Sequence, residues 1–280
     1  MTDPFMIRAH VPEFETHLAA YRQASERTRQ SLRGVRDLAY GDHPDETLDL
    51  YLPPEGEGPF PVHVFVHGGY WRAFSKLDFA FVADAVTDHG AIAAIIDYSL
   101  MPKARMATLV GQVRRAVAWL AANAGRWGGD PAALSASGAS AGAHLASLLA
   151  CRGAGEAAVP ALPVRSLLLV SGIYDLDPIT RSFLQPEIGV TAAEVAAWSP
   201  LTATPVPGPV VDVVVGAGET PPFLAQGRAF AERLAAAGVD SSFATLPGEN
   251  HMSIATALGT PGSALAERLG RAIAASRRKG

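Results

Sequence analysis

The sequence has little that could cross-link it or hold it in a membrane. Cysteine occurs once in 280 residues, at Cys151, which excludes an internal disulfide and favours a reducing compartment. The neighbours of Cys151 predict a buried residue at a helix end, not a reactive thiol. No apolar run approaches the ~18 residues that span a membrane, and the amino end lacks the basic-then-apolar order of a signal peptide. We therefore expect a cytoplasmic protein without a membrane partner.

The sequence also lacks an excess of either positive or negative charge. Charged residues make up 18% of the chain, the formal net charge is −4, and the 23 Lys and Arg are scattered along it, which does not resemble a nucleic-acid-binding surface. Histidines do not recur with carboxylates at metal-ligand spacings, and the glycine-rich motifs that bind phosphates or dinucleotides are missing. We expect no metal, no cofactor and no nucleic acid, but a small-molecule substrate. Whether the chain forms a homo-oligomer stays open.

Apolar residues are plentiful, at 49%, and their pattern predicts the fold class. Short apolar runs typical of strands covered on both faces alternate with helical patterns. The runs are HVFV, AIAAIID, AALSAS, SLLLV and VVDVVVG. Strand followed by helix, repeated, predicts an α/β fold with a mostly parallel sheet and helices on both faces.

The chain shows no repeat and no linker, so we expect one domain over residues 1–280. An amphipathic helix over about 12–32 precedes the main body. TLDLYLP alternates apolar and polar residues and predicts a half-exposed strand. The proline-rich segment over about 172–209 breaks the strand–helix rhythm, and we expect an excursion over the sheet that is a candidate lid.

One motif predicts a nucleophile. Gly138 to Gly142 read GASAG, a G-x-S-x-G between a predicted strand and a predicted helix. A turn tight enough to expose a serine at the end of a strand brings the backbone so close that residues two before and two after must be very small. The alternative is a plain turn in an Ala- and Gly-rich chain, but the strand before and the helix after favour Ser140 as the nucleophile.

A serine nucleophile needs a base and an acid that orients the base. His251 lies in a loop after the last predicted strand, where the chain order Ser, acid, His of such folds requires the base. His144 lies one helical turn past Ser140, where we expect it to pack or cap. Glu219 follows its strand by a short glycine turn and is the favoured acid. Asp175 also follows a strand and is the competing candidate, otherwise a residue that structures its loop.

Several motifs in order resemble one known family. HGGYW, SGASAGAHL, GETPPF and ENHMSI are similar to the kynurenine formamidase (arylformamidase) branch of the α/β-hydrolases, near the hormone-sensitive-lipase-like esterases. The resemblance covers most of the chain and implies the α/β-hydrolase fold, with a central sheet of about eight strands. It also implies that Ser140 is the nucleophile, Glu219 the acid and His251 the base.

The chemistry of this family implies a role for the HGGYW segment. Attack on an ester or amide carbonyl creates an oxyanion, which the N–H groups of Gly68, Gly69 and Ala141 are expected to bind. His67 is expected to order this loop without taking protons from Ser140. Tyr70 and Trp71 follow directly and are candidate substrate-binding residues. For Trp71, packing against the following helix is an equal alternative.

The leading hypothesis is therefore a serine hydrolase that cleaves an aryl formamide, such as N-formylkynurenine, through an acyl-enzyme. The alternative is a carboxylesterase acting on short-chain or aromatic esters by the same chemistry. A third hypothesis, from a different class, is a binding module on an α/β-hydrolase fold. The retained serine, acid, histidine and glycines disfavour it.

Overall fold

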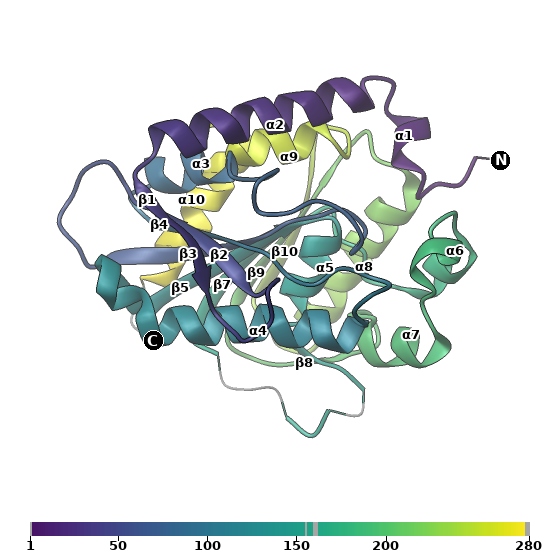
Figure 1. The fold of residues 1–280 in the computed structure, drawn as a ribbon. Coiled ribbons are helices and arrows are strands. Elements are labelled where there is room, and N and C mark those ends of the chain that lie inside the picture. Colours follow the sequence, from purple (N-terminus) through teal and green to yellow (C-terminus); the bar gives the residue numbers. More distant parts are fainter. Residues whose placement is uncertain (1, 155, 159–161, 278–280) are drawn as a thin grey trace.

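A mostly parallel sheet organises the chain (Figure 1), in a computed structural model that describes residues 2–154, 156–158 and 162–277. Within these residues the main sheet has eight strands, and only β1 and β2 run antiparallel to their neighbours. In spatial order they are β1 (Gly34–Ala39), β2 (Thr47–Tyr51), β4 (Ile92–Ile96), β3 (Phe60–Val66), β5 (Gly129–Ala139), β7 (Val164–Val170), β9 (Val210–Gly216) and β10 (Ser241–Leu246). The predicted fold class and strand number are confirmed.

Helices cover both faces of the sheet. Figure 1 shows α3 (Val82–Asp88), α9 (Ser253–Gly259) and α10 (Ala264–Ser276) on one face, with α2 (Phe14–Ser31) across them. The opposite face carries α4 (Met106–Asn123), α5 (Ala141–Ser147) and α8 (Pro221–Ala236). The buried positions of α4 include Met106, Leu109, Val113, Val117 and Leu120, as its spacing predicts.

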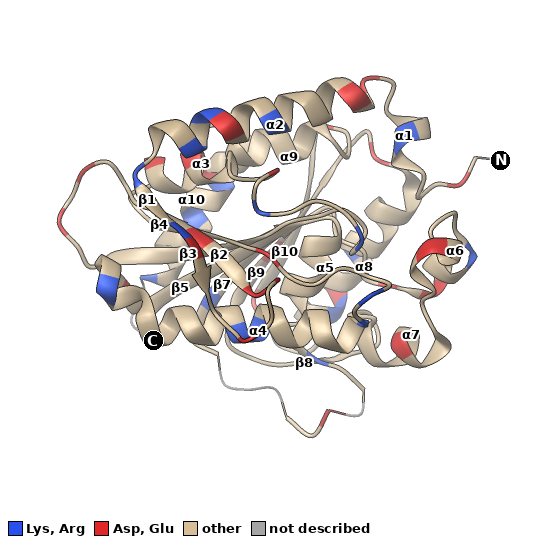
Figure 2. Ribbon diagram, in the orientation of Figure 1, with Lys and Arg blue, Asp and Glu red and all other residues tan. Residues whose placement is uncertain are grey.

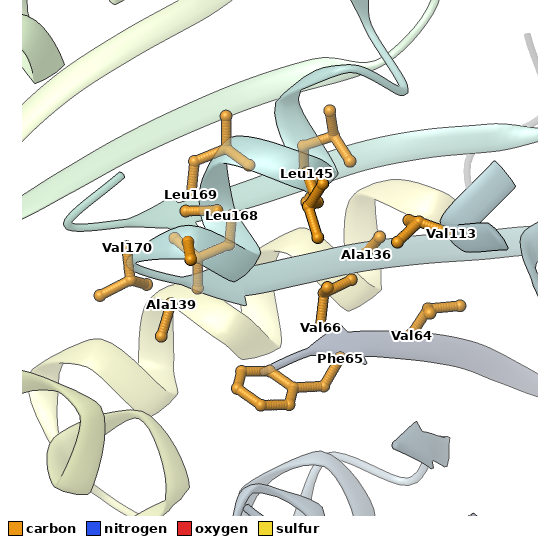
Figure 3. Close-up of a cluster of buried hydrophobic side chains, with 14 of the residues drawn as sticks. Val64, Phe65, Val66, Val113, Ala136, Ala139, Leu145, Leu168, Leu169 and Val170 are labelled. Carbon is orange, nitrogen blue, oxygen red and sulfur yellow. The ribbon is translucent and has the colours of Figure 1, made fainter. Parts of the chain in front are cut away.

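The core lies between the sheet and these helices (Figure 3). Val64 and Val66 of β3 and Leu168 of β7 are fully buried, and Val64 pairs in register with Ala136 of β5. Each such side chain contributes about 1.5–3 kcal/mol when removed from water. α5 packs against β5, so the helix that begins after Ser140 is held close to the centre of the sheet.

Two features of the first strands differ from the sequence-based prediction. β1 was not anticipated, because GVRDLA mixes apolar and charged residues without strict alternation. The prediction of a half-exposed strand at TLDLYLP is wrong, since β2 is almost entirely buried. Its polar residue Asp49 is 1% exposed because charged side chains cover it: Lys76 Nζ lies 3.5 Å and Arg36 Nε 3.8 Å from its carboxylate.

The segments at the amino end and over 172–209 border the carboxyl ends of the parallel strands. The first comprises α1 (Ile7–His10) and α2. The second is not a structureless loop: it contains the 3-10 helix η2 (Asp177–Arg181), α6 (Gln185–Ile188), α7 (Ala192–Trp198) and the short β8 (Thr204–Pro205). β8 pairs with β6 (Cys151–Arg152).

Cys151 is buried, as predicted, but it lies in β6 and not at a helix end. Its burial raises the pKa of the thiol to about 12, which keeps it protonated and unreactive.

Acidic and basic residues are interspersed along the elements, for example on α2 (Figure 2). Among the helices of the described ranges, we find none that combines the length and the apolar character needed to cross a bilayer.

Candidate active site

Ser140 occupies a strained turn between β5 and α5. Its φ of 56° and ψ of −120° lie in a region that costs a non-glycine residue roughly 1–3 kcal/mol. Its N–H donates to the carbonyl of Val170 at 2.8 Å, and its own carbonyl accepts from His144 N at 3.1 Å. These bonds to β7 and α5 hold the turn, which projects the hydroxyl beyond the end of the sheet.

The two glycines of the GASAG motif are required by close backbone contacts. A Cβ on Gly138 would lie 2.3 Å from the carbonyl oxygen of Gly142. A Cβ on Gly142 would lie 2.0 Å from the carbonyl oxygen of Val66, on the neighbouring strand β3. The carbonyl oxygens of Gly142 and Val66 therefore leave no room for a Cβ at these two positions, which is the steric reason that the motif predicts.

The predicted nucleophile, base and acid are brought together from three distant segments. Ser140 Oγ lies 3.0 Å from His251 Nε2, and His251 Nδ1 lies 2.6 Å from Glu219 Oε2. Because a carboxylate only accepts, His251 carries its proton on Nδ1 and presents the lone pair of Nε2 to the serine hydroxyl. This is the arrangement in which a histidine can remove a proton from a serine.

The carboxylate of Glu219 is buried and held by both oxygens. One oxygen, Oε2, faces His251, while Oε1 accepts from the Ser171 hydroxyl and from Gly216 N at 2.8 Å. Ser171 was not singled out from the sequence. Ser171 lies directly after β7 and has a φ of 54°, and a sequence does not reveal this backbone geometry.

Asp175 does not share this environment. Its carboxylate accepts from Asp177 N at 3.0 Å, and its own N–H donates to Gln226 Oε1 at 2.9 Å. These contacts correspond to the alternative of a loop-structuring residue, and they leave Glu219 as the carboxylate bonded to His251.

The glycine loop lies against the serine turn. A Cβ on Gly68 would lie 2.9 Å from the Ala139 carbonyl oxygen and 3.4 Å from Ser140 Cβ. Gly69 has a φ of 109°, and its carbonyl accepts from Arg72 N at 3.0 Å. Ala141 is the first residue of α5, where a backbone N–H has no partner within the helix. Three candidate oxyanion donors thus lie on the two segments that meet at Ser140.

His67 is fully buried and orders this loop. Its Nδ1–H donates to the Gly68 carbonyl at 2.8 Å, its ring stacks on Tyr98 with centroids 4.3 Å apart, and the Tyr98 hydroxyl donates to the His67 carbonyl at 2.8 Å. Burial lowers the pKa of His67 to about 4, so the ring is neutral at pH 7. Among the described residues its ring makes no hydrogen bond to Ser140, in keeping with the role expected for it.

The two aromatic residues of HGGYW lie in different places. Tyr70 borders the cavity beside Ser140, and its hydroxyl donates to the Phe5 carbonyl at 2.5 Å. Trp71 is 0% exposed and does not border that cavity. Its indole N–H donates to His144 Nδ1 at 3.1 Å, and His144 Nε2 donates to the Trp198 carbonyl at 2.9 Å. These contacts favour packing over substrate binding for Trp71, but the residue it packs against is His144 of α5 and not the following helix that the sequence suggested.

A cavity that we call the inner chamber opens at Ser140 and His251 and holds about 560 Å³ of empty space. Its walls are mostly apolar, and several come from segments that the sequence did not connect to the site. They include Ile7, Phe14 and Tyr21 from the amino end, Phe74 and Phe79 from the loop after β3, and Met252 and Ile254 around α9.

Tyr21 fixes α2 over the site, because its hydroxyl donates to the carbonyl of Met252, next to His251.

A second cavity, the outer chamber, adjoins the first. It holds about 1030 Å³ of empty space and shares Ile7, Phe14, Gly69, Tyr70 and Phe74 with the inner chamber.

The 172–209 segment contributes Phe183 to the outer chamber. Its ring meets that of Tyr70 edge-on, with centroids 5.9 Å apart, and its N–H donates to Asp3 Oδ2 at 2.5 Å. This contact joins the segment to the amino end.

The arrangement can carry out acyl transfer. It combines a serine hydroxyl, a histidine bonded to it and a buried carboxylate behind the histidine, at the mouth of an apolar chamber. Within the described residues, no group of three or more His, Cys, Asp or Glu side chains is placed to hold a metal ion.

Comparisons with known proteins agree on one superfamily. The family described as BD-FAE matches residues 48–169. The kynurenine formamidase of Danio rerio is 31% identical over 243 residues, covering 85% of this chain and 81% of that protein. The kynurenine formamidase of Salmo salar is 28% identical over 246 residues, covering 86% and 82%. The isoprenylcysteine alpha-carbonyl methylesterase ICME of Arabidopsis thaliana is 35% identical, but over 112 residues that cover 40% of this chain and 26% of that protein.

Solved structures show the same fold. The crystal structure of a candidate thioesterase from Silicibacter sp. tm1040 superposes with a TM-score of 0.79 at 27% identity, covering 95% of this chain and 97% of that one. The esterase LipW from Mycobacterium marinum gives a TM-score of 0.73 at 21% identity, with coverages of 99% and 93%.

Proposed function

Because this chain belongs to the kynurenine formamidase family of α/β-hydrolases, we propose that it hydrolyses an aryl formamide, such as N-formylkynurenine, through an acyl-enzyme on Ser140. The observation that carries the proposal is the continuous hydrogen-bonded series from Ser140 through His251 to Glu219, at the mouth of an apolar chamber. Its relatives named kynurenine formamidase match over most of their length, whereas the methylesterase matches over about a quarter of its own.

The first half of the reaction forms the acyl-enzyme. Ser140 Oγ attacks the formyl carbon while its proton passes to His251 Nε2, and Glu219 stabilises the resulting imidazolium. The carbonyl oxygen becomes an oxyanion, which accepts from the N–H groups of Gly68, Gly69 and Ala141. Each such donor can be worth about 3 kcal/mol in the transition state.

The second half releases formate. His251 gives its proton to the nitrogen of the departing arylamine as the C–N bond breaks, which leaves a formyl ester on Ser140. A water molecule then attacks this ester while His251 takes its proton. The collapse of the second tetrahedral intermediate returns the proton to Ser140 and frees formate.

The shape of the site supports this substrate class. A formyl group carries only a hydrogen on its carbonyl carbon, so it fits where the backbone of Gly68 and the turn at Ser140 are in close contact. The aryl group faces the aromatic walls of the inner chamber, among them Tyr70, Phe74 and Phe79. Such walls suit a flat apolar ring.

Esterase activity is the second candidate, because the same oxyanion donors and serine act on an ester and because a methylesterase is 35% identical to this chain over 112 residues. A parallel assay of purified protein on N-formylkynurenine and p-nitrophenyl acetate, compared by kcat/KM, separates the two. We expect formate release from the formamide at the higher kcat/KM and no turnover by Ser140→Ala. Equal or exclusive turnover of the ester would favour the second candidate.

The proposal includes one catalytic domain over residues 1–280 and a cytoplasmic location, which the single buried Cys151 supports. Labelling of Ser140 by a fluorophosphonate tests the third hypothesis, a binding module. A folded protein that does not react would support it against a catalytic role.

A further inference from the structure

The outer chamber differs from the inner chamber in bearing charge. Two arginines border it, Arg8 on α1 and Arg72 in the turn after HGGYW. Both chambers share the wall formed by Gly69, Tyr70 and Phe74. A ligand whose reacting group lies at Ser140 can therefore extend along this wall towards the arginines.

Of the two arginines, Arg72 is the less exposed, with 33% of its side chain accessible where it borders the outer chamber. Its Nη1 lies 2.6 Å from Glu187 Oε2, and its Nε is buried. The part of its guanidinium that a ligand in the chamber can reach is therefore the part not covered by Glu187 or by the core. Arg8 is instead 69% exposed and pairs with Glu15 at 2.8 Å, so water already satisfies much of its side chain.

The backbone fixes Arg72 in this position. Its N–H donates to the Gly69 carbonyl at 3.0 Å, which closes the turn in which Gly69, Tyr70 and Trp71 all have positive φ. Trp71 then anchors the turn in the core through His144. The same turn thus holds a candidate oxyanion donor at one end and the guanidinium of Arg72 at the other.

On the basis of the proposed function, we infer that the outer chamber is a subsite for a carboxylate on the tail of the substrate and that the accessible end of the Arg72 guanidinium donates to this carboxylate. A guanidinium suits a carboxylate because its donors are planar and it stays charged at every relevant pH. Glu187 pairs with Nη1 and Nε is buried, so Nη2 is the donor that we assign to the anion.

The test is a pair of formamides that differ only in this charge, N-formylkynurenine and its carboxamide. Arg72→Gln should lower kcat/KM for the carboxylate by roughly 10- to 100-fold, the value of a charge-assisted hydrogen bond, and change kcat/KM for the carboxamide less than about twofold. Arg72→Lys should recover part of the loss. The matched control is Arg22→Gln, which removes an arginine of α2 that borders neither chamber and pairs with Asp78.

Equal loss on both substrates, or loss on neither, would overturn the subsite. If the protein cleaves no formamide, the proposed function fails, but the subsite can still be tested with esters. The pair is then 4-acetoxyphenylacetate and 4-acetoxyphenylacetamide, and the same selective loss in Arg72→Gln is expected for the carboxylate. Melting temperatures of all variants show whether a loss reflects unfolding.

Discussion

His251 Nδ1 and Glu219 Oε2 lie 2.6 Å apart, and the second oxygen of the same carboxylate is held by the Ser171 hydroxyl and the Gly216 N–H. The carboxylate therefore cannot turn away from the histidine without breaking two other hydrogen bonds. An acid with one methylene more than aspartate is compatible with this site because its backbone follows β9 by a short turn, in which Glu219 N donates to the Gly216 carbonyl at 3.1 Å.

The acid can be identified by separate replacements of Glu219 and Asp175. Glu219→Gln keeps the shape of the side chain but favours the tautomer of His251 with its proton on Nε2, which cannot accept the proton of Ser140. We therefore expect kcat to fall by about 10³- to 10⁴-fold. Asp175→Asn is the matched control and should keep kcat within about threefold, because its carboxylate bonds to the Asp177 N–H in its own loop. Collapse of kcat in Asp175→Asn, with Glu219→Gln active, would reverse the assignment.

Ser171 is predicted to position the acid. Ser171→Ala removes a donor to a buried carboxylate, an interaction worth roughly 1.5–3 kcal/mol, and we expect kcat to fall about tenfold with little change in KM. Ser166→Ala is the control, because its buried hydroxyl donates to the Ala272 carbonyl, on α10. This control should lower the melting temperature but not kcat, and a similar loss of kcat in both variants would argue against positioning by Ser171.

The glycines of the serine turn give a steric prediction. In Gly142→Ala the new Cβ would lie 2.0 Å from the Val66 carbonyl oxygen, so the turn must move away from β3. We expect the melting temperature to drop by roughly 5 °C, equivalent to about 3 kcal/mol in a chain of this size, together with loss of activity. Gly125→Ala, where a Cβ meets nothing within 4 Å, should leave both unchanged. Wild-type activity in Gly142→Ala would contradict this account of the motif.

The strands that the sequence predicted well are those buried on both faces. Continuous apolar runs such as AIAAIID have one stable placement, inside a sheet covered by helices. The buried surroundings of β2 could not be read from TLDLYLP, because Lys76, which covers Asp49, comes from a loop 27 positions later. Local alternation reports the polarity of a side chain, not the identity of its partner.

The residues of the site also fall into those that local sequence predicts and those that depend on distant contacts. Ser140, Glu219 and His251 could be predicted because each follows a strand whose carboxyl end lies at one edge of a parallel sheet. The wall supplied by Tyr21 could not, since its contact with Met252 joins residues 231 positions apart. The sequence also did not decide whether Trp71 packs or binds substrate. The indole and its hydrogen-bond acceptor His144 become buried only when α5 packs beneath the loop.

Three buried histidines predict a pH-dependent stability. Burial lowers the pKa of His63 to about 3 and those of His67 and His144 to about 4. In the unfolded chain these rings take up protons near pH 6.5, whereas in the folded chain they stay neutral. The unfolded state therefore binds more protons below pH 6.5, and the free energy of unfolding should fall as the pH drops from about 7 to 4.

Asp97 acts in the opposite direction, because burial raises its pKa to about 6. Between about pH 4 and 6 the folded state holds one proton more on Asp97 than the unfolded state. For these four groups the net difference near pH 5 is about two protons, three from the histidines less one from Asp97. The slope is then about 3 kcal/mol per pH unit.

Urea denaturation at pH 5 to 7.5 measures this slope. Below pH 6 the free energy of unfolding should decrease steeply, and above pH 7 the histidines should contribute no slope. Asp97→Asn removes the opposing group, so its slope near pH 5 should be steeper than that of the wild type by about one proton, or about 1.4 kcal/mol per pH unit. If the three rings were protonated in the folded chain, only Asp97 would contribute near pH 5, and the free energy of unfolding would increase as the pH falls, by about 1.4 kcal/mol per pH unit. That result would contradict the prediction, and the hydrogen bond from Trp71 to His144 Nδ1 could then not exist at that pH.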